Sequence, residues 1–157
     1  MSFTDPERAN APQIAKPLFA RPRLIVAVFI GGALGTLARE SIVLAVAAQE
    51  GVPWGILLVN LIGAFLLGWL LSALGARDTE TPAKRDARLF FGTGVLGGFT
   101  TYSALATDTA LLLESDPVVG VLYAIGSVLA GIALAALGVW VGSQALRQRA
   151  DSRDDPS

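Results

Sequence analysis

Hydrophobic residues gather in four long segments of this 157-residue chain, and short polar connections separate them. Each segment reaches the roughly 20 apolar residues that a helix needs to cross the hydrocarbon core of a bilayer. Helices of soluble proteins are seldom this long while remaining apolar on every face. The pattern therefore predicts an all-α membrane protein with four transmembrane helices. The expected helices are residues 24–48, 54–74, 89–113 and 118–146.

Basic residues lie almost entirely on one side of this predicted bundle. Eleven of the twelve Lys and Arg residues fall in the N-terminal segment 1–23, the connection 75–88 or the C-terminal segment 147–157. Because four spans bring these segments to the same side, the excess of positive charge predicts that both termini are cytoplasmic. We expect a cytoplasmic tail over 1–23, a transmembrane domain over 24–146 and a polar tail over 147–157. This is the organisation of a multi-pass protein in a bacterial-type inner or plasma membrane.

Composition excludes several kinds of chemistry. The chain has no histidine and no cysteine, so it lacks the commonest general base and any thiolate metal ligand. Charged residues make up 16% of the chain, against about a quarter in an average soluble domain. The formal net charge of −1 gives no basic surface for nucleic acid. We therefore expect a membrane protein that is not an enzyme.

Polar residues inside the predicted spans need partners, because the hydrocarbon core offers none. Arg39 lies well inside the first span, and two interpretations stay open. It either extends to the far interface or binds carbonyl groups of a loop or broken helix. Neighbouring residues on a helix do not share a face, so we expect no simple ion pair between Arg39 and Glu40. Asn60 either stabilises a contact between helices, which is the favoured interpretation, or donates hydrogen bonds to an anion.

Tyr123 and Ser127 in the fourth span are four residues apart and therefore share one helix face. Their hydroxyl groups either line a polar path or bond the carbonyl groups of the preceding turn. From the spacing alone, the second interpretation is favoured.

Small residues recur at a spacing that lets helices approach closely in lipid. They predict a compact bundle that forms an oligomer. A dimer is the natural way to build an aqueous path from four-helix subunits. The pairs are Gly31 and Gly35, Gly94 and Gly98, and Gly138 and Gly142.

The sequence GGFTTYSAL, residues 97–105, lies in the middle of the third span. Gly97 and Gly98 weaken a helix, and Thr100 and Thr101 offer hydroxyl groups in place of lost backbone hydrogen bonds. A broken helix at membrane depth is tolerated only where protein or water covers it, and its free carbonyl groups suit a hard cation. We expect a break over 97–100 near the bilayer midplane. The alternative is a glycine kink without a ligand.

Three segments together resemble the CrcB/Fluc family of fluoride channels. The resemblance spans roughly residues 24–142, and it implies a small four-helix subunit that pairs in antiparallel orientation to form a dual-topology dimer. Such a dimer exports fluoride passively and thereby lowers its toxicity. The segments are GGALGTLARE (31–40), GILLVNLIGAFLLG (55–68) and GTGVLGGFTTYSAL (92–105).

The resemblance also implies roles for individual residues. A structural sodium ion, which is not transported, would be held at the dimer centre by the backbone carbonyl groups of Gly97 and Thr100. Arg39 would be the structural arginine of the first helix. Residues that would line the fluoride pore are Asn60, Tyr102, Ser103, Leu105, Tyr123 and Ser127.

The chain departs from the family pattern at the pore. Family members typically read T-T-F-S-T-F, whereas Tyr102 and Leu105 stand at the two phenylalanine positions. Tyr102 keeps an electropositive ring edge that can face an anion, and Leu105 has none. Gly131 offers no hydroxyl group as third member of the fourth-helix polar track. Asp108 stands where an acidic residue often follows the third-helix motif.

Alternatives to a homodimeric fluoride channel remain. The one-sided basic charge would suit a heterodimer with an inverted paralogue, although a homodimer is favoured. In such a heterodimer this chain could be a non-conducting subunit, since both phenylalanines are replaced. A proton-coupled exporter of cationic compounds would also be a small four-helix dimer, with Glu40 or Asp108 as its carboxylate.

Overall fold

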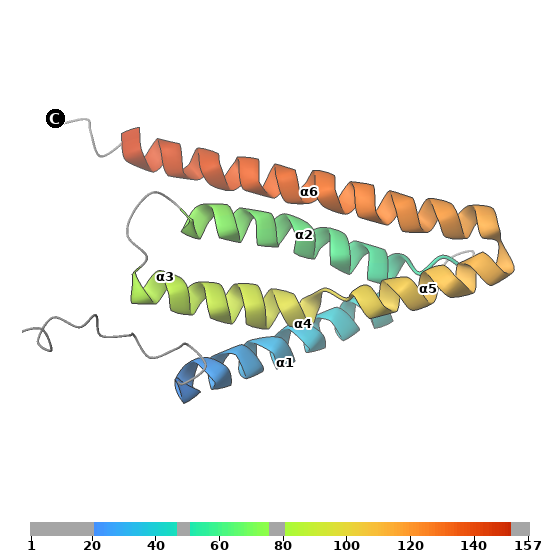
Figure 1. Cartoon of the computed structure of the whole chain (residues 1–157), viewed down its shortest axis with the longest axis horizontal. Helices are drawn as coiled ribbons and strands as arrows, with labels where there is room; N and C mark the ends of the chain where they lie inside the picture. Colours follow the sequence, from blue (N-terminus) through green and yellow to red (C-terminus); the bar gives the residue numbers. More distant parts are fainter. Residues whose placement is uncertain (1–20, 47–50, 76–80, 152–157) are drawn as a thin grey trace, which may run out of the picture.

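Helices make up almost all of the chain that the structure describes (Figure 1). This computed structural model describes residues 21–46, 51–75 and 81–151, so most of the two expected tails lies outside them. The segment η3 is a π-helix, and the others are α-helices. The elements are α1 (Pro22–Ala45), α2 (Trp54–Leu74), α3 (Pro82–Ala87), η3 (Arg88–Leu96), α4 (Gly97–Phe99), α5 (Tyr102–Ser115) and α6 (Pro117–Asp151).

Within the described residues, four helical stretches are long and apolar enough to cross a membrane. They are α1, α2, the run Pro82–Ser115 from α3 to α5, and Pro117–Gln144 of α6. The second span has the predicted bounds, and the first and fourth begin and end within a few residues of theirs. The third span ends close to its predicted bound but begins earlier, at Pro82. The prediction of an all-α protein with four spans is confirmed.

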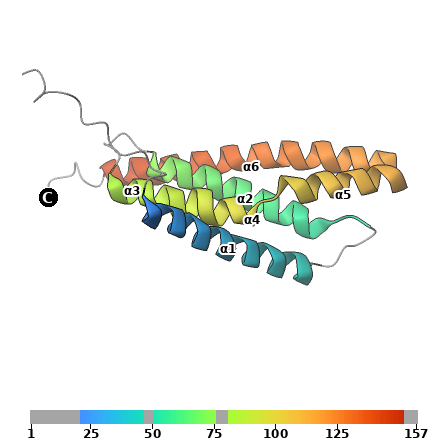
Figure 2. The ribbon, with the colours of Figure 1, turned by 60° about the horizontal axis from the view of Figure 1, so that its bottom comes forward.

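The spans run side by side in two closely packed pairs (Figures 1 and 2). Helix α2 packs along α6, and α1 packs against η3 and α4. Helix α5 packs on the first half of α6 and not along α1. The main neighbour of the third span therefore changes from α1 to α6 at residues 100 and 101, while α2 contacts both parts.

The predicted glycine pairs lie at these helix contacts. A methyl group added to Gly35 would stand 2.0 Å from the Val95 carbonyl oxygen, and one on Gly98 would stand 2.2 Å from that of Gly32. On the other side of the bundle, a methyl group on Gly138 would stand 2.1 Å from the Phe65 carbonyl oxygen. These distances leave no room for any side chain. The prediction that the pairs mark close helix packing is confirmed.

The third span is interrupted between α4 and α5. Thr100 (φ −81°, ψ 155°) and Thr101 (φ −148°, ψ 119°) have extended backbones, whereas Gly97 and Gly98 remain helical. The expectation that the glycines themselves unwind over 97–100 is therefore wrong in its position. Gly98 is needed for the close approach of α1, and the helix ends only after Phe99.

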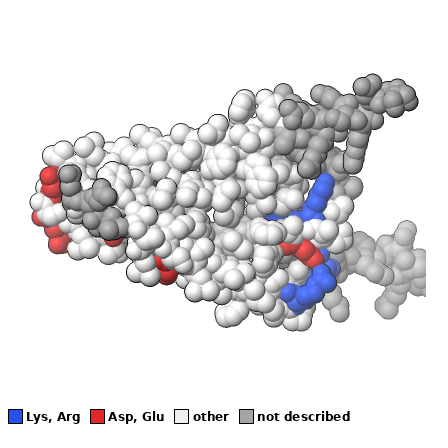
Figure 3. All heavy atoms as spheres, turned by 180° about the vertical axis from the view of Figure 1, so that it is seen from behind, with Lys and Arg blue, Asp and Glu red and all other residues white. Residues whose placement is uncertain are grey.

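Charged residues separate along the length of the bundle. Figure 3 shows Lys and Arg atoms at the end where α1 and α3 begin, and most Asp and Glu atoms toward the opposite end. At the basic end, Arg23 and Arg85 flank Asp86, with nitrogen–oxygen distances of 2.6 and 3.4 Å. The basic side predicted from the sequence thus corresponds to one end of the bundle.

Candidate functional site

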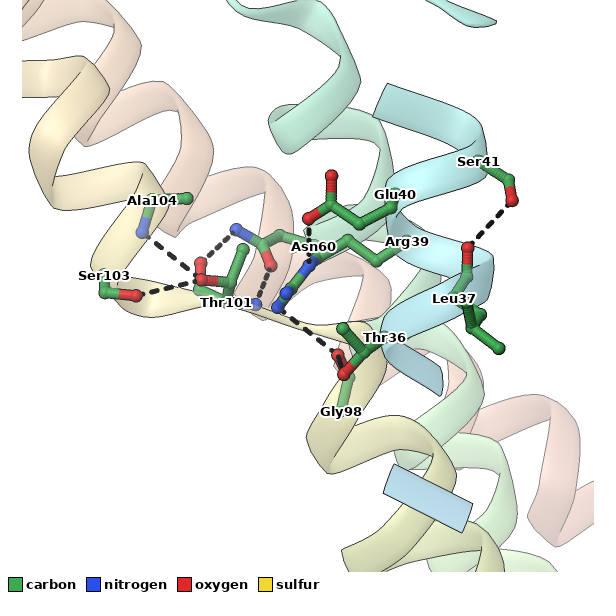
Figure 4. A network of polar contacts seen from close by, with 10 residues as sticks. All are labelled: Thr36, Leu37, Arg39, Glu40, Ser41, Asn60, Gly98, Thr101, Ser103 and Ala104. Atoms are coloured by element: carbon green, nitrogen blue, oxygen red, sulfur yellow. Dashed lines mark hydrogen bonds and ion pairs between the residues drawn. The ribbon is translucent and has the colours of Figure 1, made fainter. Parts of the chain in front are cut away.

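The interruption of the third span is held by one side chain of α2. Asn60 donates from Nδ2 to the Thr101 carbonyl oxygen at 2.9 Å, and its Oδ1 accepts from the Thr101 backbone N–H at 2.8 Å (Figure 4). Both main-chain polar groups of Thr101 are therefore satisfied by a single amide. This replaces the hydrogen bonds that an uninterrupted helix would supply.

The interruption redirects the donors of two carbonyl groups. In a continuous α-helix, the N–H of residue 101 would bond the carbonyl of Gly97, and that of Ala104 would bond the carbonyl of Thr100. Here the Thr101 N–H bonds Asn60, and the Ala104 N–H bonds Oγ1 of Thr101 at 3.2 Å. Thr101 thus caps α5, and the Gly97 and Thr100 carbonyl groups lose their helical donors.

The carbonyl group of Gly98, which lies between Gly97 and Thr100, is contacted by two side chains of α1. Nη1 of Arg39 and Oγ1 of Thr36, one turn earlier, each lie 3.4 Å from the Gly98 carbonyl oxygen (Figure 4). Nε of Arg39 also lies 3.5 Å from Oε1 of Glu40, so the expectation of no ion pair between these neighbours is wrong. The arginine side chain thus contacts both the Gly98 carbonyl oxygen and the Glu40 carboxylate.

The remaining polar groups at the interruption face outward. Oγ1 of Thr101 lies 3.2 Å from the hydroxyl of the exposed Ser103, and Tyr102 is 82% exposed. Leu105, one turn further, is half-buried. By contrast, the hydroxyl of Thr100 bonds the Leu96 carbonyl within its own segment at 3.0 Å. Ser103 and Tyr102 therefore present hydroxyl groups on the surface of the single chain.

Tyr123 and Ser127 form a separate group on α6. Both line a hollow of about 270 Å³ between α2 and α6, whose other lining residues are apolar. Ser127 donates its hydroxyl to the Tyr123 carbonyl oxygen, which is the favoured interpretation of their spacing. The Tyr123 hydroxyl is buried and has no hydrogen-bond partner among the described residues. Within the described residues, no hydrogen bond joins this pair to Asn60 or Ser103.

Asp108 lies in neither group. It borders a smaller hollow of about 140 Å³, which Gly51, Pro53 and Ser115 also line, and its Oδ2 is buried without a partner among the described residues. Those residues contain no cluster of three or more Asp and Glu side chains that could hold a metal ion. Oxygen ligands at the interruption would therefore come from the main chain and from hydroxyl groups.

One contributor to the site was not singled out from the sequence. Thr36 was missed, although its place one turn before Arg39 puts it on the same face of α1. Thr101 was expected to offer its hydroxyl in place of a lost backbone hydrogen bond, and the bond that it accepts from the Ala104 N–H confirms this. The sequence did not indicate that Asn60 also binds the main chain of Thr101. A threonine three residues before Ala104 is an N-cap signal that could have located the start of α5.

Comparison with known proteins identifies the family. Residues 26–139, which include the interruption and Asn60, match the family model described as CrcB-like protein, Camphor Resistance (CrcB). The chain belongs to the CrcB family. The resemblance expected from the three sequence segments is thereby confirmed.

Named relatives of this CrcB chain match most of its length. Fluoride-specific ion channel FluC 2 of Leifsonia xyli subsp. xyli is 44% identical over 128 residues, which are 81% of this chain and 88% of the relative. Fluoride-specific ion channel FluC 1 of Cutibacterium acnes is 45% identical over 129 residues (81% and 87%). Fluoride-specific ion channel FluC of Thermus thermophilus is 42% identical over 118 residues (73% and 91%). With four spans and such bacterial relatives, the CrcB chain is a multi-pass protein of the cell membrane.

Proposed function

We propose that the chain is a subunit of a fluoride-selective channel, which exports fluoride passively from the cytoplasm and lowers its toxicity. The observation that carries the proposal is the extent of the match. Relatives named fluoride-specific ion channels are 42–45% identical to this chain and are covered over 87–91% of their own lengths. The matched region contains the interruption and the groups around it.

The side chains at the site have the chemistry that a fluoride path needs. Fluoride is small and strongly hydrated, so a path must replace its water with hydrogen-bond donors. Asn60 has a second Nδ2 hydrogen besides the one that Thr101 uses. Hydroxyl groups add further donors, and Tyr102 also has a ring edge. We propose a pore lined by Asn60, Tyr102, Ser103, Leu105, Tyr123 and Ser127.

A structural sodium ion at the interruption belongs to the same proposal. The carbonyl groups of Gly97 and Thr100 would hold it, and the loss of their helical donors supports this role. Carbonyl oxygens suit a hard cation, and interrupted membrane helices are a known source of them. When bound, the ion would supply a fixed positive charge that lowers the electrostatic cost of an anion nearby. Arg39 would stabilise the same turn through the Gly98 carbonyl.

A second subunit in antiparallel orientation would complete the pore. The proposal places the interruption near the bilayer midplane, where an exposed backbone break must be covered by protein or water. Ser103 and the 82% exposed Tyr102 leave polar groups uncovered on the single chain. We favour a homodimer. The one-sided basic charge supports the heterodimer as second candidate, as do relatives numbered FluC 1 and FluC 2.

No coupled energy source is needed for export through such a channel. A membrane potential that is negative inside drives an anion outward by about 2.3 kcal/mol per charge per 100 mV. The pore has only to make the crossing possible and to reject other anions.

Fluoride efflux from liposomes tests the proposal. The purified chain, reconstituted with potassium fluoride inside and sodium present, is expected to release fluoride rapidly once an ionophore relieves the charge imbalance. A fluoride electrode measures the release of fluoride. The control is the release of chloride from vesicles loaded with chloride, measured with a chloride electrode. Efflux that appears only with an inverted paralogue would support the heterodimer. Proton-driven uptake of organic cations without fluoride efflux would favour the exporter instead.

A further inference from the structure

Asn60 does more at the interruption than a pore-lining donor requires. Both of its polar side-chain atoms are bound to the main chain of one residue, Thr101, which is 41 positions away in the sequence. Its Oδ1 takes the very N–H that a continuous helix would give to the Gly97 carbonyl. The amide therefore competes with the helix for that donor.

We infer that Asn60 is the positioning residue of the interruption: by accepting the Thr101 N–H, it keeps the Gly97 carbonyl free to face a cation. The inference rests on the proposed channel and its sodium ion. It gives the side chain a role in the cation site, although Asn60 itself does not bind the cation.

The fit of α2 against the interruption supports this role. Gly63, one turn after Asn60, lies so close that an added methyl group would stand 2.2 Å from Cγ2 of Thr100. Val59, next to Asn60, is fully buried. Helix α2 thus holds the extended residues at two successive turns, once by hydrogen bonds and once by close approach. The position of the Asn60 amide is fixed by the packing of its own helix.

Substitutions can separate positioning from anion binding. An aspartate at this position keeps an oxygen acceptor for the Thr101 N–H, but it loses the amide donor and adds a negative charge that repels fluoride. A leucine has a similar size and removes both hydrogen bonds. Thr107→Val is a matched control, because within the described part of the chain Oγ1 of Thr107 bonds only the Ser103 carbonyl one turn back, at 3.0 Å.

The experiment compares the wild type with Asn60→Asp, Asn60→Leu and Thr107→Val in three measurements. Hydrogen exchange of a peptide covering residues 97–105 reports on the Thr101 amide. The rise in Tm when sodium replaces N-methylglucamine reports on the cation site. Fluoride efflux from liposomes reports on the pore.

Asn60→Leu is expected to speed exchange at Thr101 by about tenfold, as for the loss of one hydrogen bond, and to abolish the rise in Tm with sodium. Asn60→Asp is expected to keep the exchange protection and the sodium effect while losing fluoride efflux. Thr107→Val should match the wild type in all three measurements.

Other outcomes overturn the inference. If the Asn60→Leu variant shows wild-type hydrogen exchange and keeps the rise in Tm with sodium, Asn60 does not position the interruption. Its role would then be that of a donor in the pore, whether or not fluoride efflux changes. If Asn60→Leu fails to fold, Asn60→Asp still decides, since loss of its sodium effect and exchange protection would contradict the role of Oδ1. A wild type that conducts fluoride without any sodium effect would refute the inference and leave the channel standing. A wild type without efflux, both alone and together with an inverted paralogue, would instead refute the proposed function.

Discussion

The hydroxyl of Tyr123 is a polar group in apolar surroundings. It is buried in a hollow with apolar walls, and it has no hydrogen-bond partner among the described residues. Leaving a buried donor unsatisfied costs about 1–3 kcal/mol. A passing anion in the proposed pore would give this donor its partner.

Tyr123→Phe is therefore expected to raise the free energy of unfolding by about 1 kcal/mol, because it removes an unsatisfied hydroxyl. The same change should slow fluoride efflux, because the pore loses a donor. Thermal unfolding in detergent and efflux from liposomes measure the two effects. A variant that is less stable and conducts normally would show that the hydroxyl has a structural partner and no part in the pore.

The sequence indicated which residues of the site are unusual, and one of its two interpretations of Arg39, binding to carbonyl groups of a broken helix, is confirmed. It did not indicate which carbonyl group Arg39 binds or which residue Asn60 binds. Asn60 and Arg39 stand out because each is polar within an apolar span. Their contacts, with Thr101 and with the Gly98 carbonyl, depend on how α1 and α2 meet the third span. Packing between helices is set by shape along their whole length, and local sequence does not contain it.

At the scale of elements, hydropathy was sufficient for the four spans but misplaced the interruption. Span length and apolar character follow directly from the bilayer, so residues 54–74 were predicted to the residue. The break was expected over 97–100, because glycine weakens a helix. Gly98 instead serves the contact with α1, and the hydrogen bonds from Asn60 determine that the main chain leaves the helix at Thr100 and Thr101.

Gly98→Ala tests the contact between the first and third spans. The added methyl group would stand 2.2 Å from the Gly32 carbonyl oxygen, so the helices must separate, which costs about 1–3 kcal/mol of stability. Gly131→Ala is the matched control, since nothing lies within 4 Å of its added methyl group. Thermal unfolding should show a lower Tm for Gly98→Ala alone. Equal Tm values for both variants would contradict the packing.

The cap of α5 gives a second test at this scale. Thr101→Val removes the oxygen that accepts the Ala104 N–H and should destabilise the protein by about 1 kcal/mol. Thr101→Ser keeps the oxygen and should remain within a few tenths of a kcal/mol of the wild type. Chemical or thermal unfolding checks the order of the three proteins. A serine variant as unstable as the valine variant would assign the effect to packing of the methyl group.

For the whole molecule, the one-sided basic charge and the proposed antiparallel homodimer predict different orientations of the chain in the membrane. Basic residues at one end favour insertion with that end in the cytoplasm, whereas an antiparallel homodimer needs copies in both orientations. The chain has no cysteine, so single cysteines can report on orientation without background. Gln144 lies on α6 toward the basic end, and Glu114 lies near the turn at the opposite end.

Gln144→Cys and Glu114→Cys, each in intact cells, are expected to react with a membrane-impermeant maleimide in about half of the molecules, as a symmetric antiparallel pair requires. Labelling is measured as the fraction of protein that shifts in mass. Reaction of the Glu114→Cys variant alone would mean that every copy has the same orientation. The inverted partner would then have to be a different chain.

This chain is proposed to conduct fluoride selectively. The measurement that tests this is the current through a planar bilayer that contains the purified protein, with fluoride and chloride present on both sides in opposite concentration gradients. The predicted result is a steady current that reverses near the equilibrium potential of fluoride and persists when the potassium gradient is changed. A current that reverses near the equilibrium potential of chloride or potassium would contradict it.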